Sequence, residues 1–117
     1  RQVYVHNCAA AESLNYGVSL GLDPKMIFNL LSNGAGQSKM SDLRMPLMID
    51  HAYEPATANM PIAYKDISVI SEDIKSNNCS TPLFDATQKL YDIAKENVPA
   101  TYDTGAVYEV YRQKLVK

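Results

Sequence analysis

Apolar residues recur at helical spacing over the first part of the chain. From Val3 to Leu20 this spacing predicts a long helix, and the alanines at positions 9 to 11 would let another helix pack closely against it. Gly21 follows, and glycine readily adopts the left-handed conformation found just beyond a helix end. The residues expected on the buried face are Val5, Cys8, Ala9, Glu12, Tyr16 and Leu20.

Two further helical segments are predicted before residue 54. Asp23 and Pro24 are typical of an N-cap and a first helical position, and Asn33-Gly34 breaks the pattern again. The apolar stripe between them consists of Ile27, Leu30 and Leu31. Residues 38–53 predict a weaker helix or two turns, because Pro46 would interrupt a regular helix.

Residues 62–77 predict a long helix with two contrasting sides. At about 100° per residue, one face collects Ala63, Ile67, Ile70 and Ile74. Lys65 falls nearly opposite this stripe, on the side of Glu72 and Ser76. The side chain of Lys65 is therefore expected to point away from the core, and on the residues alone it is a solvated lysine.

The C-terminal third predicts two more helices. Thr81 and Pro82 would begin one that runs to about Asn97, and a loop at 98–105 would precede a last short helix. Their apolar positions are Leu83, Ala86, Leu90, Ile93 and Ala94, then Val107, Val110, Tyr111 and Leu115. No segment shows a convincing strand-like alternation. The chain is therefore predicted to form a single all-α domain over residues 1–117, a bundle of five or six helices.

Composition and charge restrict the classes of function. The net charge of −2 lacks the basic excess of a nucleic-acid-binding surface. No apolar run is long enough to cross a bilayer and no signal-peptide pattern is present, so we expect a cytoplasmic protein without membrane or nucleic-acid partners. Cys8 and Cys79 lack metal-ligand spacing and are expected to be reduced thiols.

Few residues indicate chemistry by themselves. His6 and His51 have no cysteine or carboxylate at ligand spacing, so no metal site is predicted. Asp42 and Arg44 could form a local ion pair. The stretch NGAGQS at 33–38 fits either a helix end with a turn or a backbone loop that approaches a ligand.

Three long segments carry further information because of their order. They are AAAESLNYGVSLGLDPKMIFNLLSNGAGQS, YKDISVISEDIKSNNCSTPLFDATQKLYDIA and DTGAVYEVY, and from the first to the last they span residues 9–111, nearly the whole chain. They resemble the C-terminal helical domain of the β-hydroxyacid dehydrogenases. This family includes 3-hydroxyisobutyrate dehydrogenase, tartronate semialdehyde reductase and L-threonate dehydrogenase, and the domain is of the 6-phosphogluconate dehydrogenase C-terminal type.

The resemblance implies an oxidoreductase acting on a small β-hydroxy acid with NAD or NADP. The cofactor would be bound mainly by an N-terminal Rossmann domain. We expect that domain, and the catalytic lysine that relays the proton, to precede Arg1 in a longer polypeptide. The helical domain would contribute to the cleft between domains and to homo-oligomerisation, with Tyr4, Tyr64 and Val69 as candidate contacts. By itself this segment is expected to be inactive.

The resemblance also assigns roles to particular residues. Lys65 matches the lysine of the family's Lys-Asp helix, which reaches toward the nicotinamide, so Lys65 is expected to bind the cofactor. Asp66 matches the accompanying acid, with a structural role. Gln37 and Ser38 are the expected substrate-binding residues by family position. Gln37 stands where the family commonly has Asn, and Ala58 stands near a common aromatic position.

Two other functions stay open on the sequence. One is a non-catalytic helical module, derived from this family, that serves interaction or dimerisation. The other is a reader protein that keeps the fold but has lost the catalytic lysine. A Rossmann fingerprint together with a lysine about one helical segment before Arg1 would distinguish the enzyme from both.

Overall fold

Helices account for the regular structure of this chain, whose computed structural model describes residues 1–116. The elements in chain order are α1 (Gln2–Ser19), α2 (Pro24–Ser32), α3 (Lys39–Asp50), α4 (Met60–Ser76), α5 (Pro82–Asn97), a 3₁₀ turn η1 (Thr104–Val107) and α6 (Tyr108–Arg112). Within the described residues, extended backbone pairs only at an isolated bridge between Asn59 and Asp103. The predicted all-α bundle of five or six helices is confirmed.

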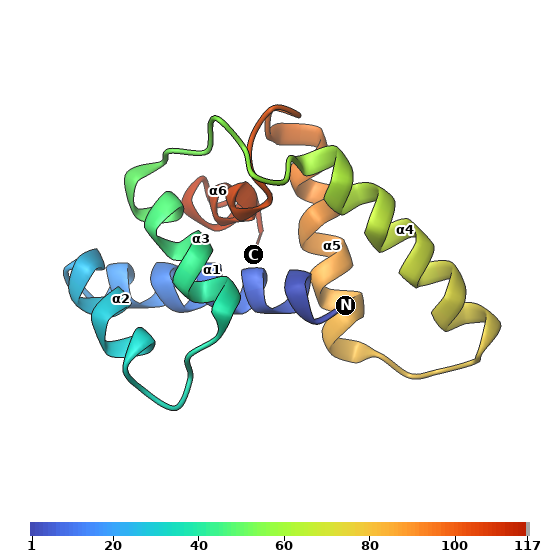
Figure 1. Cartoon of the computed structure of the whole chain (residues 1–117), viewed down its shortest axis with the longest axis horizontal. Helices are drawn as coiled ribbons and strands as arrows, with labels where there is room; N and C mark the ends of the chain where they lie inside the picture. The colour runs from blue at the N-terminus through green and yellow to red at the C-terminus, as the bar shows by residue number, and fades with distance from the viewer. Residues whose placement is uncertain (117) are drawn as a thin grey trace.

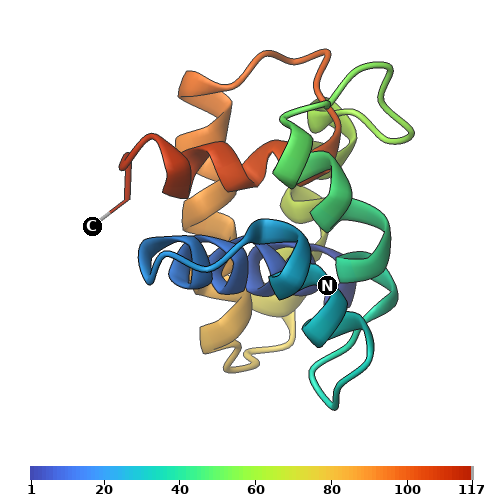
Figure 2. The same cartoon turned by 90° about the vertical axis from the view of Figure 1, so that its left-hand side faces the viewer.

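The arrangement is built around α1. This helix contacts α2, α3, α5, α6 and η1, whereas α4 packs mainly on α5 (Figure 1). In Figure 1, α2 and α3 lie toward one end of α1, and the α4–α5 pair lies toward the other. The perpendicular view shows α6 running alongside α1 and across α5 (Figure 2). The first turns of α1 thus lie between two groups of helices.

Several predicted helix ends are confirmed. Asp23 accepts a hydrogen bond from the backbone N–H of Met26 at 3.3 Å, with Pro24 in the first turn. Gly21 has a φ of +84°, the left-handed conformation expected just after α1. Thr81 is different. Helix α5 begins at Pro82 as predicted, but Thr81 makes no side-chain cap, and its hydroxyl donates to Asp85 instead.

The prediction that Pro46 breaks the third segment is wrong. Helix α3 is continuous from Lys39 to Asp50, with Pro46 inside it. Proline removes one backbone donor from the helix ladder. Two features offset that loss: Ser38 and Ser41 form a reciprocal capping box at the helix start, and one face of the helix is buried. The last helix is also shorter than predicted, because Leu115 lies beyond its end at Arg112.

The predicted faces of α1 and α5 are largely wrong, because only Cys8 and Ala94 of the residues predicted there are buried, and the predicted face of α4 is confirmed. In α1 the buried residues are Tyr4, Asn7, Cys8, Ala10, Ala11, Leu14 and Gly17. In α5 they are Phe84, Thr87, Tyr91 and Ala94. Glu12, Tyr16 and Leu20 are exposed, and Leu83 is 68% exposed. Both helices carry apolar residues on more than one side, so contacts with other helices decide which side is buried. In α4 the predicted isoleucine stripe does face the core.

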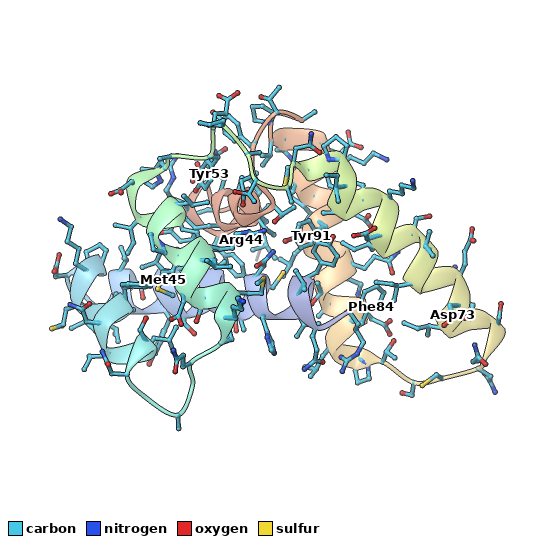
Figure 3. All side chains as sticks on the ribbon, viewed as in Figure 1. Arg44, Met45, Tyr53, Asp73, Phe84 and Tyr91 are labelled. Atoms are coloured by element: carbon cyan, nitrogen blue, oxygen red, sulfur yellow. The ribbon has the colours of Figure 1, made fainter. Side chains whose placement is uncertain are left out.

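A polar network crosses the core, and it includes Arg44 and Tyr91, which are labelled in Figure 3. Arg44 pairs with Asp103 at 3.0 Å, so the predicted pairing of Arg44 with Asp42 is wrong. Asp103 also accepts hydrogen bonds from three backbone N–H groups, at residues 57, 58 and 105. Tyr91 donates to the carbonyl of Thr104 and accepts from Asn7. This network ties the loop before α4 to the segment that leads into η1.

Candidate functional site

A small cavity lies where the turn after α2 and the start of α3 face α1. Its volume is about 130 Å³. The lining residues are His6, Ala9, Ala10, Ser13, Leu31, Gly36, Gln37, Ser38 and Ser41. The structure therefore brings together Gln37 and Ser38, the two residues expected to bind substrate. It does not bring Lys65 into the same cavity, because Lys65 is absent from this lining.

The local sequence fixes the wall that carries Gln37 and Ser38. The Gln37 side-chain N–H₂ donates to Asp42 at 2.7 Å, and the Ser38 hydroxyl oxygen accepts from the Ser41 backbone at 3.0 Å. A Cβ atom at Gly36 would lie 3.1 Å from a methyl of Leu31, so glycine permits the close turn. The side-chain oxygen of Gln37 and the hydroxyl hydrogen of Ser38 are left to make hydrogen bonds with a ligand.

Lys65 lies on the exposed side of α4, as the helical period predicts. The next residue, Asp66, accepts a hydrogen bond from the Tyr4 hydroxyl at 2.6 Å. Burial raises the pKa of Tyr4, and the bond to Asp66 raises it further, so the hydroxyl keeps its proton and acts as a donor. The Tyr4–Asp66 bond joins α1 to α4, which agrees with a structural role for Asp66. The cofactor role of Lys65 stays a prediction.

The two sets of predicted site residues flank the same stretch of α1. Tyr4 reaches toward Asp66, whereas His6 lines the cavity with Gln37 and Ser38. A step of two residues along a helix is a rotation of about 200° around its axis, so the side chains of Tyr4 and His6 point in nearly opposite directions. The two sets therefore lie on nearly opposite sides of α1. A molecule that contacts both would have to extend across the first turns of this helix.

Sequence reasoning missed the parts played by Tyr4 and His6. Tyr4 was expected to be a surface contact, but it is buried, with its ring edge against Tyr91. His6 was not predicted to line a ligand cavity. A signal for His6 was present, because His6, Ala10 and Ser13 share one small, polar face at helical spacing. Tyr4 had no comparable signal, because Asp66 is remote in sequence.

Other features of the described residues carry little chemistry. Burial raises the pKa of Cys8 to about 12, so this thiol is a poor nucleophile. Among residues 1–116, no group of histidine, cysteine or carboxylate side chains is arranged to hold a metal ion. In the same residues, no helix combines the length and apolar character needed to span a bilayer.

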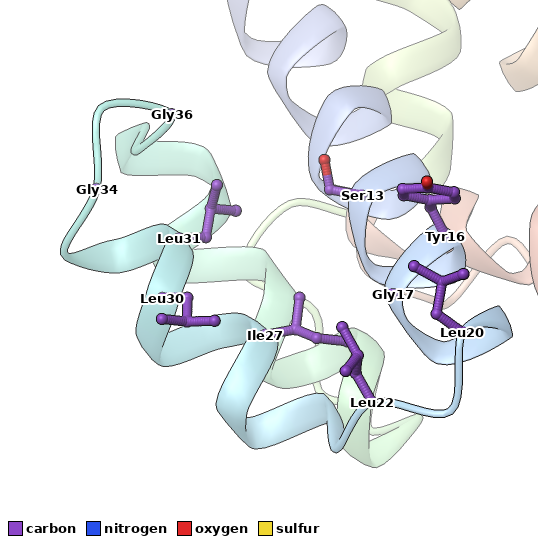
Figure 4. A pocket seen from close by; sticks show the side chains of 10 residues that line it. All are labelled: Ser13, Tyr16, Gly17, Leu20, Leu22, Ile27, Leu30, Leu31, Gly34 and Gly36. Atoms are coloured by element: carbon purple, nitrogen blue, oxygen red, sulfur yellow. The ribbon is translucent and has the colours of Figure 1, made fainter.

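A larger apolar groove adjoins the small cavity. It has a volume of about 340 Å³ and lies between the C-terminal half of α1 and α2 (Figure 4). Ser13, Leu31 and Gly36 line both spaces. Apart from the hydroxyls of Ser13 and Tyr16, the groove is lined by apolar side chains and glycines. It offers surface for contact but no acid, base or charged group.

The fold defines a class: an all-α domain that carries a small polar cavity and an exposed lysine on α4. A family profile described as NAD-binding of NADP-dependent 3-hydroxyisobutyrate dehydrogenase matches residues 3–111. The chain belongs to this family.

Individual relatives agree with this assignment. L-threonate dehydrogenase from Cupriavidus necator is 27% identical over 107 residues, which cover 92% of this chain and 36% of the relative. Glyoxylate/succinic semialdehyde reductase 2, chloroplastic, from Arabidopsis thaliana is 30% identical, over 87% of this chain and 28% of the relative. The chain thus spans about a third of the length of the curated relatives it matches.

The fold has solved counterparts as well. The crystal structure of 3-hydroxyisobutyrate dehydrogenase from Salmonella typhimurium superposes with a TM-score of 0.87 at 23% identity. The match covers 93% of this chain and 38% of that one. The helical arrangement described above is therefore the fold of one portion of that enzyme.

Proposed function

We propose that this chain is the helical domain of an NAD(P)-dependent dehydrogenase of small β-hydroxy acids. The observation that carries the proposal is the family match over residues 3–111, which includes every candidate site residue. The polar cavity at Gln37 and Ser38 supports it, because the residues expected to touch substrate line one space. We place the protein in the cytoplasm.

The remainder of the active site would come from a second domain of the full-length protein. We propose a Rossmann domain that holds most of the cofactor, NAD or NADP, with Lys65 facing the nicotinamide end. The share of the relatives that this chain covers, about a third, leaves room for such a domain. Clefts between domains are common sites for cofactors and substrates.

This chain's residues would bind and orient rather than complete the reaction. Gln37 and Ser38 would hold polar groups of the hydroxy acid, and the Lys65 cation would stabilise negative charge near the cofactor. The nicotinamide, when bound, accepts hydride from the carbinol carbon. The Tyr4–Asp66 bond would hold α4, the helix that carries Lys65, against the first turns of α1.

A second candidate role is self-association. Twelve large hydrophobic residues are exposed in the described chain, and half of them lie from position 16 to position 30: Tyr16, Val18, Leu20, Leu22, Met26 and Leu30. Such a cluster at one end of the molecule favours an interface. We propose a homo-oligomer that uses this end, and Tyr4 is excluded as a contact because it is buried. A single-chain mass by light scattering at high protein concentration would contradict it.

Turnover by the full-length protein tests the proposal directly. L-threonate and 3-hydroxyisobutyrate are suitable probes, each offered with NAD or NADP, and nicotinamide reduction is followed. We expect oxidation of at least one acid with one cofactor, and none by residues 1–117 alone. If the full-length protein binds neither cofactor and oxidises neither acid, the chain serves as an interaction module instead.

A further inference from the structure

Tyr4 connects α1 to the helix that carries Lys65. Its hydroxyl donates to the Asp66 carboxylate at 2.6 Å, across 62 positions of the sequence. Among residues 1–116, this is the one side-chain hydrogen bond that links α4 to another helix. Otherwise α4 packs on α5 and η1, and the side chains that it buries are apolar. The polar contact that joins α4 to α1 is therefore the Tyr4–Asp66 bond.

A hydrogen bond supplies a directional constraint that apolar packing lacks. Burial of apolar surface is non-directional, whereas a hydrogen bond weakens steeply when its angle is distorted. The Tyr4–Asp66 bond is short and its acceptor is a carboxylate, which places it among the stronger kinds. It therefore limits both the rotation of α4 about its own axis and its distance from α1.

The donor of this bond is held rigidly by the core. Tyr4 is 7% exposed, and its ring packs edge-on against Tyr91 with 5.6 Å between the ring centroids. Tyr91 in turn accepts a hydrogen bond from Asn7 and donates one to the carbonyl of Thr104. Asp66 is thus held by a fixed group of the core and not by a mobile surface side chain.

Lys65 directly precedes Asp66, so a constraint on one residue also places the other. Successive residues of a helix are about 100° apart around its axis and about 1.5 Å apart along it. The Lys65 side chain is exposed, and within the described part of the chain it makes neither a hydrogen bond nor an ion pair. The point from which the Lys65 side chain leaves the molecule is therefore set by α4, which Asp66 ties to α1.

We propose that Tyr4 is a positioning residue, which acts through Asp66 to hold Lys65 where its ammonium group meets the nicotinamide end of the cofactor. This inference rests on the proposed function. Tyr4 is buried, so it touches neither substrate nor cofactor, and its hydroxyl takes no part in proton transfer. Without the bond α4 shifts relative to α1, and a displacement of about 1 Å at a reacting centre can lower a rate by up to about hundredfold.

Steady-state kinetics of the full-length protein tests this role, with the better substrate of L-threonate and 3-hydroxyisobutyrate. Tyr4→Phe removes the hydroxyl and keeps the ring that packs on Tyr91. We expect this variant to lower kcat/KM about tenfold. Added to Lys65→Ala, it should lower kcat/KM by less than about a further twofold, because the group that it displaces is already absent. A purely structural role would lower kcat/KM by the same factor in both backgrounds.

Tyr111→Phe is the matched control, because Tyr111 also joins α1 through a carboxylate, donating to Glu12 at 3.2 Å. Glu12 lies about 12 Å along α1 from Tyr4, and we expect this variant to leave kcat/KM near the wild-type value. Asp66→Asn separates position from charge, since its amide oxygen still accepts from Tyr4. It should cost less than about threefold, whereas Asp66→Ala should match Tyr4→Phe.

The outcomes separate this inference from the proposed function. Equal kcat/KM in wild type and Tyr4→Phe would overturn the role of Tyr4, and so would effects of Tyr4→Phe and Lys65→Ala that simply multiply. Either result leaves the dehydrogenase assignment intact. If the wild type oxidises neither acid, or if Lys65→Ala is as active as the wild type, the proposed role of Lys65 fails and this inference fails with it.

Discussion

At the scale of single residues, Arg44 and Asp103 form a buried ion pair in the core. Asp103 is 1% exposed and receives the Arg44 guanidinium at 3.0 Å. A buried carboxylate that loses its cation destabilises a fold by about 3–5 kcal/mol. We expect Arg44→Met to lower the free energy of unfolding by about 3 kcal/mol in urea denaturation, because three backbone donors still support Asp103.

A double-mutant cycle separates the two carboxylates that could pair with Arg44. Coupling with Asp103→Asn should be large, at about 1–3 kcal/mol, and coupling with Asp42→Asn should be close to zero. Strong coupling with Asp42 would contradict the structure. Sequence alone favours Asp42 because it is near in the chain, whereas the true partner lies far along the chain and is brought in by the fold.

Glu109 gives the molecule a pH dependence at low pH. Burial alone would raise its pKa, but hydrogen bonds from Arg112, Tyr53 and Gln113 outweigh burial and lower the pKa from 4.5 to about 2. A carboxyl whose folded pKa is depressed stabilises the fold above its unfolded pKa, and that contribution is lost as pH falls. Stability should therefore decline between about pH 4.5 and pH 2, with Glu109 contributing on the order of 2 kcal/mol.

Urea denaturation at about pH 6, above this window, and at about pH 2.5, near its lower end, measures the Glu109 contribution. Glu109→Gln should lower stability at the higher pH and reduce its dependence on pH. Glu72→Gln, at an exposed position on α4, should have little effect on either. An unchanged pH dependence in Glu109→Gln would assign the acid sensitivity to other carboxylates.

At the scale of helices, the contact of α1 with α2 depends on the absence of a side chain at Gly17. A Cβ atom there would lie 2.5 Å from Cδ1 and 2.9 Å from Cγ1 of Ile27. Overpacking of this kind costs about 1–3 kcal/mol, and the better helix propensity of alanine returns up to about 1 kcal/mol. Gly17→Ala should therefore lower the melting temperature, with a net loss of about 1–2 kcal/mol.

Shortening the opposing side chain tests this explanation. Ile27→Val removes the methyl that Cβ would meet, so the double variant should be more stable than the sum of the two single effects implies. If the two effects simply add, the contact between Gly17 and Ile27 does not limit the approach of α1 to α2.

Helix ends and helix faces differed in how well the sequence predicted them. Asp23, Pro24 and Gly21 act within one or two turns, so the ends of α1 and α2 followed from local chemistry. The α4 stripe was also predictable, because its two sides differ sharply in polarity. The buried faces of α1 and α5 were not, since both helices are apolar on more than one side and only packing selects among them. Pro46 was misjudged because the cap at Ser38 and the burial of α3 act beyond the local residue.

At the scale of the whole molecule, the candidate site residues lie on two sides of α1. The family resemblance supplied Lys65, Gln37 and Ser38, and the structure gathers the latter two in one cavity. Sequence could not supply the Tyr4–Asp66 bond, because it depends on two helices that meet only in the folded chain.

The central claim is that this domain presents Lys65 to a nicotinamide cofactor, and paired alanine variants of the full-length protein test it most directly. Lys65 and Lys75 are both exposed on α4, about 15 Å apart along its axis. Neither truncation opens the core, so both variants should keep their stability within about 0.5 kcal/mol. We predict that Lys65→Ala lowers kcat/KM about hundredfold, because a cation near developing charge is lost, while Lys75→Ala stays near wild type. If both variants oxidise the hydroxy acid at the wild-type rate, Lys65 is only a solvated charge and the account is contradicted.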